Sequence, residues 1–234
     1  YQPALWLFFI ANSFNFPYKA IAGYHLVIYW LSVFCQSIYI LINIIPPSRF
    51  KTIPWKNGKG TTTELAISEG GTLTDFDWRL SIASVVEDGD FSDFSGYLRN
   101  LILISGRGIE LSHTLAGQTR IDILDPLLSV STFDGGSRTR GRLLDGAITD
   151  FNLMTRSGKY QVDVQTYTEP GQVKVLPCDL CFIYALTGEV ALTVPDTGLP
   201  QVIAEKHLVQ IMPLTKQVIL DGQQLIVIRL KNAA

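Results

Sequence analysis

The sequence is poor in the residues from which disulfide scaffolds and nucleic-acid surfaces are built. Charged residues make up only 17% of its 234 residues, and 19 basic against 21 acidic side chains leave a net charge of −2. Because a nucleic-acid interface normally needs a basic excess, this balance predicts no nucleic-acid partner. Three cysteines do not suggest a secreted disulfide scaffold. These absences leave a mainly apolar chain.

Histidine is equally scarce, with three residues and no HxH pair. Metal sites in β-barrels commonly take imidazole and carboxylate ligands from neighbouring strands. His113 and Glu110 are three residues apart on an expected strand, so they point to opposite faces. We therefore expect no bound metal and no other cofactor. His113 and His207 are expected at the surface or at loop edges.

Two short motifs resemble functional motifs but lack their context. Cys178 and Cys181 have CxxC spacing, yet a zinc site would need a second pair and a thioredoxin-like motif would need a following helix. Glycine-rich residues 58–62 lack the GxxxxGK[ST] spacing and lead into an expected strand. We expect reduced thiols in the first case and a tight turn in the second. An open alternative is that free N–H groups of that turn face a small anion.

Charge is also absent from one end of the chain. Through residue 48 the only formal charge is Lys19, and the other 186 residues carry 18 basic and 21 acidic groups. We expect residues 1–45 to be a hydrophobic N-terminal extension, arising either as a non-native translation or as a membrane segment over residues 20–45. An ordinary hydrophobic element is the third alternative. A genuine span would be a helix with the following domain in the cytoplasm, and the expected location is otherwise cytoplasmic.

From residue 46 onward, short apolar runs alternate with turn sequences. Residues 69–71, 88–90, 134–136, 195–198 and 221–222 supply the glycine, proline and aspartate that tight turns need. Strand-length runs between such turns indicate an all-β sandwich or barrel. We expect residues 46–156 to form a first barrel half and residues 157–234 a second, shorter one.

Four motifs occur in order at residues 54–65 (PWKNGKGTTTEL), 76–83 (FDWRLSIA), 89–96 (GDFSDFSG) and 149–156 (TDFNLMTR). Together they resemble the HutD/Ves family of small bacterial proteins, over roughly residues 46–230. Lys59 and Ser95 depart from the family pattern. The resemblance implies a cupin-like double-stranded β-helix (jelly roll), with two barrel halves in one bicupin-like unit. It also implies no established enzymatic activity, and either a link to histidine utilisation or a stress-induced protein.

Strand alternation predicts a polar face on three expected strands. In FDWRLSIA, Arg79 and Ser81 oppose Trp78 and Leu80, and similar alternation occurs in TTTELAI and TDFNLM. If the polar faces converge inside a barrel, Arg79 can clamp a carboxylate. Further ligand contacts are expected from the following residues: Ser81, Asn152, Thr62, Glu64, Trp55, Lys56 and Asn57.

These site residues have different expected roles. Ser81, Asn152 and Thr62 would donate or accept neutral hydrogen bonds, while Glu64 or Asp150 would receive an amine or fix Arg79. The expected places of Trp55 and of Lys56 and Asn57 are an apolar wall and a loop near the pocket mouth. The alternative is a structural ion pair of Arg79 with Glu64 or Asp150, without any ligand.

The leading functional hypothesis is a non-catalytic binding protein for a small polar carboxylate. By the resemblance, that ligand is a histidine-breakdown intermediate such as urocanate or a formyl- or formimino-glutamate, which the protein senses or buffers. One alternative is a metal-independent enzyme with Glu64 or Asp150 as general base, which would need a raised carboxylate pKa. Another is a structural or stress-associated protein whose barrel holds no ligand. The sequence leaves open a homodimer, and a membrane partner if residues 20–45 are genuine.

Overall fold

The computed structural model describes residues 26–29, 40–55, 60–195 and 200–233. These residues form twenty strands and one short 3₁₀ helix, η2 (Pro47–Arg49). The strands are β1 (Leu26–Tyr29), β2 (Ile40–Ile45), β3 (Lys51–Pro54), β4 (Gly60–Ile67), β5 (Trp78–Val85), β6 (Gly89–Asp90), β7 (Tyr97–Ser105), β8 (Ile109–Leu115), β9 (Gln118–Leu124), β10 (Val130–Asp134), β11 (Arg138–Leu143), β12 (Ile148–Arg156), β13 (Tyr160–Tyr167), β14 (Gly171–Val175), β15 (Leu180–Ala185), β16 (Val190–Thr193), β17 (Gln201–Ile203), β18 (Leu208–Ile211), β19 (Val218–Gly222) and β20 (Leu225–Asn232).

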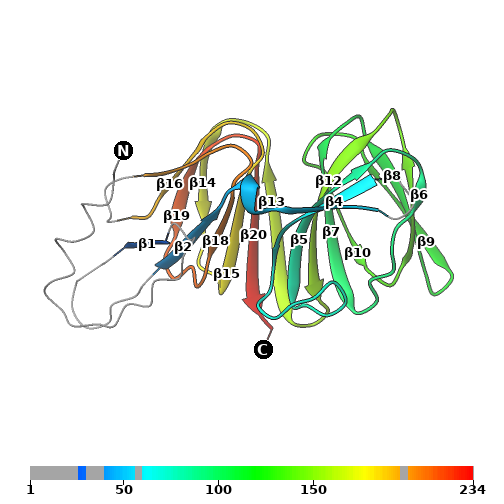
Figure 1. The fold of residues 1–234 in the computed structure, drawn as a ribbon, viewed down its shortest axis with the longest axis horizontal. Coiled ribbons are helices and arrows are strands. Elements are labelled where there is room, and N and C mark those ends of the chain that lie inside the picture. The colour runs from blue at the N-terminus through cyan, green and yellow to red at the C-terminus, as the bar shows by residue number, and fades with distance from the viewer. Residues whose placement is uncertain (1–25, 30–39, 56–59, 196–199, 234) are drawn as a thin grey trace, which may run out of the picture.

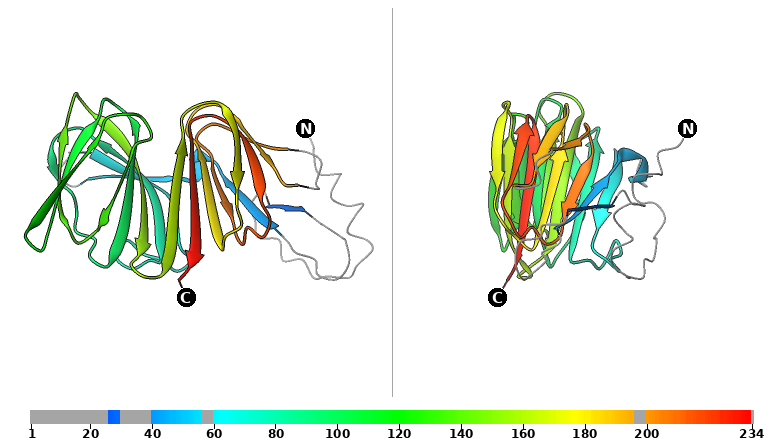
Figure 2. Two further views of the ribbon diagram at one scale, coloured as in Figure 1. Left: turned by 180° about the vertical axis from the view of Figure 1, so that it is seen from behind. Right: turned by 90° about the vertical axis from the view of Figure 1, so that its left-hand side faces the viewer.

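Two β-barrels lie side by side, as Figure 1 shows. The first barrel consists of the sheet β10-β7-β12-β5-β4-β3 and the sheet β6-β11-β8-β9. The second consists of β1-β2-β18-β15-β20-β13 and β14-β19-β16-β17. Every strand pair in these sheets is antiparallel, and the left view of Figure 2 shows the two barrels from behind. The all-β, two-barrel fold expected from the sequence is confirmed.

The tight turn between β7 and β8 requires a glycine. Gly106, directly after β7, has φ = 97°, a conformation that side chains with a Cβ rarely adopt. A Cβ added there would lie 2.6 Å from the carbonyl oxygen of Ala147. The chain can therefore turn from β7 into β8 only with glycine at this position.

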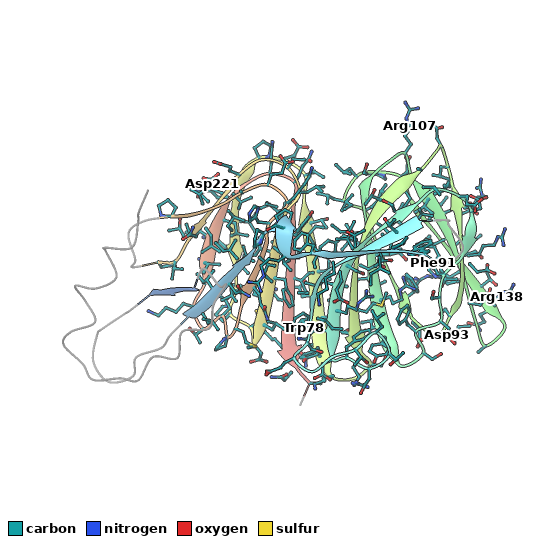
Figure 3. The ribbon with its side chains drawn as sticks, in the orientation of Figure 1. Trp78, Phe91, Asp93, Arg107, Arg138 and Asp221 are labelled. Carbon is teal, nitrogen blue, oxygen red and sulfur yellow. The ribbon has the colours of Figure 1, made fainter. Side chains whose placement is uncertain are left out.

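The two six-stranded sheets pack against each other through apolar side chains. Leu80 and Phe151 from the first barrel meet Phe182 and Ile226 from the second in one buried cluster. The rings of Trp78 and Phe182 lie 4.7 Å apart between centroids, and Figure 3 labels Trp78 at this junction. β7 and β15 are buried on both faces and are apolar over most of their length, whereas β5 and β12 also carry polar residues on the face toward the interior of the first barrel.

The interiors of the two barrels differ in chemistry. The second barrel is filled by a cluster of aliphatic side chains, among them Ile183, Leu192 and Leu220, all almost completely buried. The first barrel has an apolar cluster around Leu101 and Ile109 at one end and polar side chains in the remainder. Only the first barrel thus presents polar groups for a ligand within the described residues.

β2 belongs to the second barrel, since it pairs with β18 in the register Ile42↔Ile211, and Ile42 is fully buried. Residues 20–25 and 30–39 of the predicted membrane segment lie outside the described residues. In the described part of the chain, no helix is both long and apolar enough to cross a bilayer. β12 ends at Arg156 and β13 begins at Tyr160 in the other barrel. The domain boundaries at residues 46 and 157 stay predictions.

Candidate functional site

A partly open cavity of about 680 Å³ occupies the polar part of the first barrel. That size lies within the range of about 300–1,000 Å³ typical of small-molecule sites. Phe91, labelled in Figure 3, lies on its wall in the first barrel. The polar side chains that line it include Trp55, Thr62, Arg79, Ser81, Arg99 and Asn152.

The cavity floor is a ladder of facing side chains from three strands. Met154 on β12 pairs with Arg79 on β5 and with Arg99 on β7. One rung deeper, Asn152 pairs with Ser81. The predicted alternation is the cause, because the intervening residues Trp78, Leu80, Phe151 and Leu153 point to the junction between the barrels.

Arg79 is already held by a carboxylate. Its Nε donates a 2.8 Å hydrogen bond to Oε2 of Glu64, and their side chains are 6% and 16% exposed. Glu64 is therefore a partner of the arginine, as one of the two sequence-based interpretations expected. Arg79 nevertheless lines the cavity, where its charge is compensated before any ligand arrives.

Arg99 was not predicted, although it is the more deeply buried arginine. It is 4% exposed, and burial lowers its pKa to about 10, while Asp150 opposes and Arg79 reinforces this effect. Its Nη2 donates to Oδ1 of Asn152 at 3.1 Å, and its Nε is buried without a partner in the described part of the chain. The guanidinium carbon also lies over three aromatic rings, in cation–π contact. Its distance is 5.3 Å from the ring centroid of Phe91, 5.5 Å from that of Phe94 and 5.1 Å from that of Phe133.

Asp150 lies behind Asn152, fully buried and outside the cavity lining. Its Oδ1 accepts a hydrogen bond from Nδ2 of Asn152, and its Oδ2 has no partner within the residues that the structure describes. Burial raises the pKa of Asp150 to about 7, against the opposing effects of Arg99 and Asn152. Asn152 thus connects the buried cation to the buried carboxyl group.

Trp55 forms part of the wall, beside the β3–β4 hairpin. Its indole Nε1 donates to Oγ1 of Thr62 at 2.7 Å, and its backbone N–H donates to the carbonyl of Gly60 at 2.9 Å. Of the predicted residues, Trp55, Thr62, Arg79, Ser81 and Asn152 line one cavity. Lys56 and Asn57 lie outside the described residues. The ligand-binding role of all these residues stays a prediction.

The prediction that His113 lies at the surface is wrong, since it is 4% exposed. Its Nδ1 lies 2.9 Å from Oγ1 of Thr139 and its Nε2 lies 3.3 Å from Oγ of Ser131, so both ring nitrogens have partners. The ring also packs on Phe133 at 4.2 Å. The inward positions of β8 alternate from Ile109 through Leu111 to His113, which brings the ring into the barrel.

Metal ligands are not grouped in the described ranges, which contain no set of three or more His, Cys, Asp or Glu side chains placed to hold an ion. The two cysteines of the CxxC motif are both buried and unbridged, in the second barrel. The polar side chains that line the cavity include arginine, amide and hydroxyl groups, which suit an anion, and the carboxylates of Glu87 and Asp90 also lie on its wall.

The HutD family profile matches residues 47–227. The chain belongs to the HutD family. A *Pseudomonas putida* protein named "Uncharacterized 21.2 kDa protein in hutC 3'region" is 36% identical over 126 residues, which are 54% of this chain and 64% of that protein. The chain thus covers slightly less than two thirds of this relative.

Two solved structures are similar over most of the chain. HutD from *Pseudomonas fluorescens* SBW25 has a TM-score of 0.68 and 28% identity, over 82% of this chain and all of that one. Oxalate decarboxylase from *Bacillus subtilis* has a TM-score of 0.57 and 9% identity, over 82% of this chain and 77% of that one. The second likeness concerns the fold alone, and it identifies the two barrels as cupin-like.

Proposed function

We propose that this HutD-family protein binds a small carboxylate metabolite in the first barrel and releases it unchanged. The observation that carries the proposal is Arg99, an almost fully buried arginine on the cavity wall whose Nε has no hydrogen-bond partner among the described residues. An enclosed donor without a partner is costly, and an anion that accepts from it removes that cost. Arg79, Ser81 and Asn152 lie on the neighbouring strands within the same cavity and supply further donors.

The proposed metabolite class is a histidine-breakdown intermediate, such as urocanate or N-formyl-L-glutamate. Membership of the HutD family and the hutC context in the name of the *P. putida* relative support this class. The apolar lining from Trp55, Phe91, Phe94 and Met154 would contact the body of the ligand, while the arginines bind its carboxylate. The role would then be to sense or buffer the metabolite, in the cytoplasm.

Calorimetric titration of the full chain with N-formyl-L-glutamate and with urocanate tests the proposal. We expect binding of at least one of them, and Arg99→Met should weaken it by about tenfold to a hundredfold, because a hydrogen bond to a charged group is lost. Ser81→Ala, a smaller change in the same cavity, should weaken it less. The matched control is Arg107→Met, which removes an exposed arginine at a loop tip (Figure 3) and should leave affinity unchanged.

The same samples distinguish binding from catalysis. Recovery of the intact ligand by chromatography after long incubation supports the binding protein. Consumption of the ligand that is lost in Glu64→Gln or Asp150→Asn would instead support the enzyme. If neither ligand binds and neither raises the unfolding temperature, the structural role remains, in which the Arg79–Glu64 pair only stabilises the barrel.

A further inference from the structure

The interior of the first barrel holds two arginines and two carboxyl groups, but they are paired unequally. Arg79 and Glu64 are in direct contact at 2.8 Å. Arg99 and Asp150 are not joined by an ion pair, because Asn152 lies between them and hydrogen-bonds to both. The second pair is therefore coupled through a neutral amide.

Both ends of this Arg99–Asn152–Asp150 relay carry an unsatisfied atom. Nε of Arg99 and Oδ2 of Asp150 are enclosed, and neither has a hydrogen-bond partner among the residues described by the structure. An ionised carboxylate in such a place is unfavourable unless a cation compensates it, and a proton on Asp150 removes the charge. The empty barrel therefore has two accessible charge states, which differ by one proton on Asp150.

An anion beside Arg99 changes this balance. The guanidinium would then face the ligand carboxylate on one side and Asp150, through Asn152, on the other. Two anions sharing one cation in a low-dielectric interior disfavour each other's ionised form. We propose that the barrel takes up a carboxylate together with one proton, which resides on Asp150. This inference rests on the proposed function, and it makes Asp150 the residue that sets the charge state in which the ligand is accepted.

The raised pKa of Asp150, about 7 by burial, supports this assignment, since small changes near neutrality then move the proton. The other groups around the Arg99–Asn152–Asp150 relay come from several elements. Arg79 on β5 and Glu64 on β4 hold each other, and Glu87 and Asp90 lie at the cavity wall near β6. β11 contributes Gly141 to the lining, and β10 contributes Phe133 beside Arg99.

His113 on β8 is a further titratable group on this side of the barrel, and its Nε2 lies 3.5 Å from Oδ2 of Asp122, which Arg120 also contacts. Its ring packs on Phe133, whose ring also contacts Arg99, so it lies one aromatic ring away from the relay. Burial lowers the pKa of His113 from its ordinary value of 6.5, and this makes the ring neutral at and above neutral pH. Because a neutral ring can also accept a proton, the Asp150→Asn variant decides which of the two groups takes it up.

The test is calorimetric titration of the wild-type chain with N-formyl-L-glutamate between about pH 6 and about pH 9, where both ligand carboxylates are ionised. Above about pH 7 we expect the dissociation constant to rise about tenfold per pH unit, as one linked proton requires. Titration at one pH in two buffers of different ionisation enthalpy should show net proton uptake by the protein. Neither measurement needs a variant.

In the Asp150→Asn variant the side chain at this position is neutral at every pH. This variant should therefore bind N-formyl-L-glutamate with little dependence on pH. Asp145→Asn is the matched control, since it removes an exposed carboxylate and should keep the wild-type slope. Binding that is independent of pH and of buffer in the wild type would overturn the proton coupling and leave the proposed function intact. Absence of binding at every pH would overturn both. A variant slope equal to that of the wild type would assign the proton elsewhere and overturn the role of Asp150.

Discussion

The indole Nε1 of Trp55 donates a 2.7 Å hydrogen bond to Oγ1 of Thr62, across the hairpin that borders the cavity. This bond fixes the indole against β4, with its ring carbons 3.1 Å from the place where a Cβ of residue 60 would lie. The aromatic wall of the candidate site is therefore positioned by a hydroxyl group and by the absence of a side chain at one glycine.

Trp55 should report occupancy of the cavity by its fluorescence. Ligand binding changes the surroundings of this half-buried indole, whereas Trp78 is enclosed at the junction between the barrels. We expect the ligand-induced change in tryptophan emission to disappear in Trp55→Phe and to persist in Trp78→Phe. Loss of the change in Trp78→Phe alone would place the ligand elsewhere.

Gly60→Ala should destabilise the first barrel. The added Cβ would lie 2.1 Å from the carbonyl oxygen of Ser84, which is backbone and cannot move aside. We expect a loss of about 1–3 kcal/mol in the free energy of unfolding, as for other overpacked sites, measured by urea titration. Gly171→Ala is the control, because nothing lies within 4 Å of its added Cβ, and it should change stability by less than about 0.5 kcal/mol.

Phe182→Ala should weaken the junction between the barrels. Phe182 is fully buried and packs on Trp78 at 4.7 Å. Truncation of a buried phenylalanine typically costs about 3–5 kcal/mol, so the urea midpoint should fall strongly. Ile123→Ala, at a position that is 61% exposed, should leave the midpoint nearly unchanged. Equal effects of the two substitutions would contradict the packing of Phe182 at the junction.

His113→Gln should change how stability depends on pH. Burial lowers the pKa of His113 in the folded state, so the unfolded chain binds the proton more readily as the pH falls below 6.5. The wild type should therefore lose stability in that window, and glutamine, which does not titrate, should remove this loss. Urea midpoints at about pH 8 and about pH 5 measure the difference between the two proteins. If the wild-type and variant midpoints differ by the same amount at both pH values, His113 does not contribute to the pH dependence of stability.

The sequence predicts the parts of the site that lie on strands with mixed polarity. In β5 and β12, polar residues alternate with apolar ones, so the cavity-facing positions of Arg79, Ser81 and Asn152 could be read from a period of two. The predicted Arg79–Glu64 contact also follows, because the two strands are neighbours in the chain. The barrels themselves follow from turn spacing and from the family motifs.

Arg99 and His113 could not be found in the same way. Arg99 precedes the run LILIS, which is buried on both faces of β7 and therefore shows no alternation. A signal was present in Arg99 as the single charge of a mainly apolar strand, but its partner Asn152 is 53 residues away in the sequence. His113 lies at the end of an alternating run, and its burial depends on Thr139 and Ser131 from other strands. Such partners are fixed by sheet register, which local sequence does not encode.

The length of β12 cannot change by even one residue. Its odd positions, Phe151 and Leu153, hold the second barrel in place, while its even positions, Asp150 and Asn152, face the interior of the first. An insertion or deletion of one residue would exchange these two sets. The side chain of Asn152 would then point to the junction between the barrels, and that of Phe151 would point into the first barrel. The attachment of the barrels and the recognition of a ligand must therefore be inherited together, because one strand encodes both.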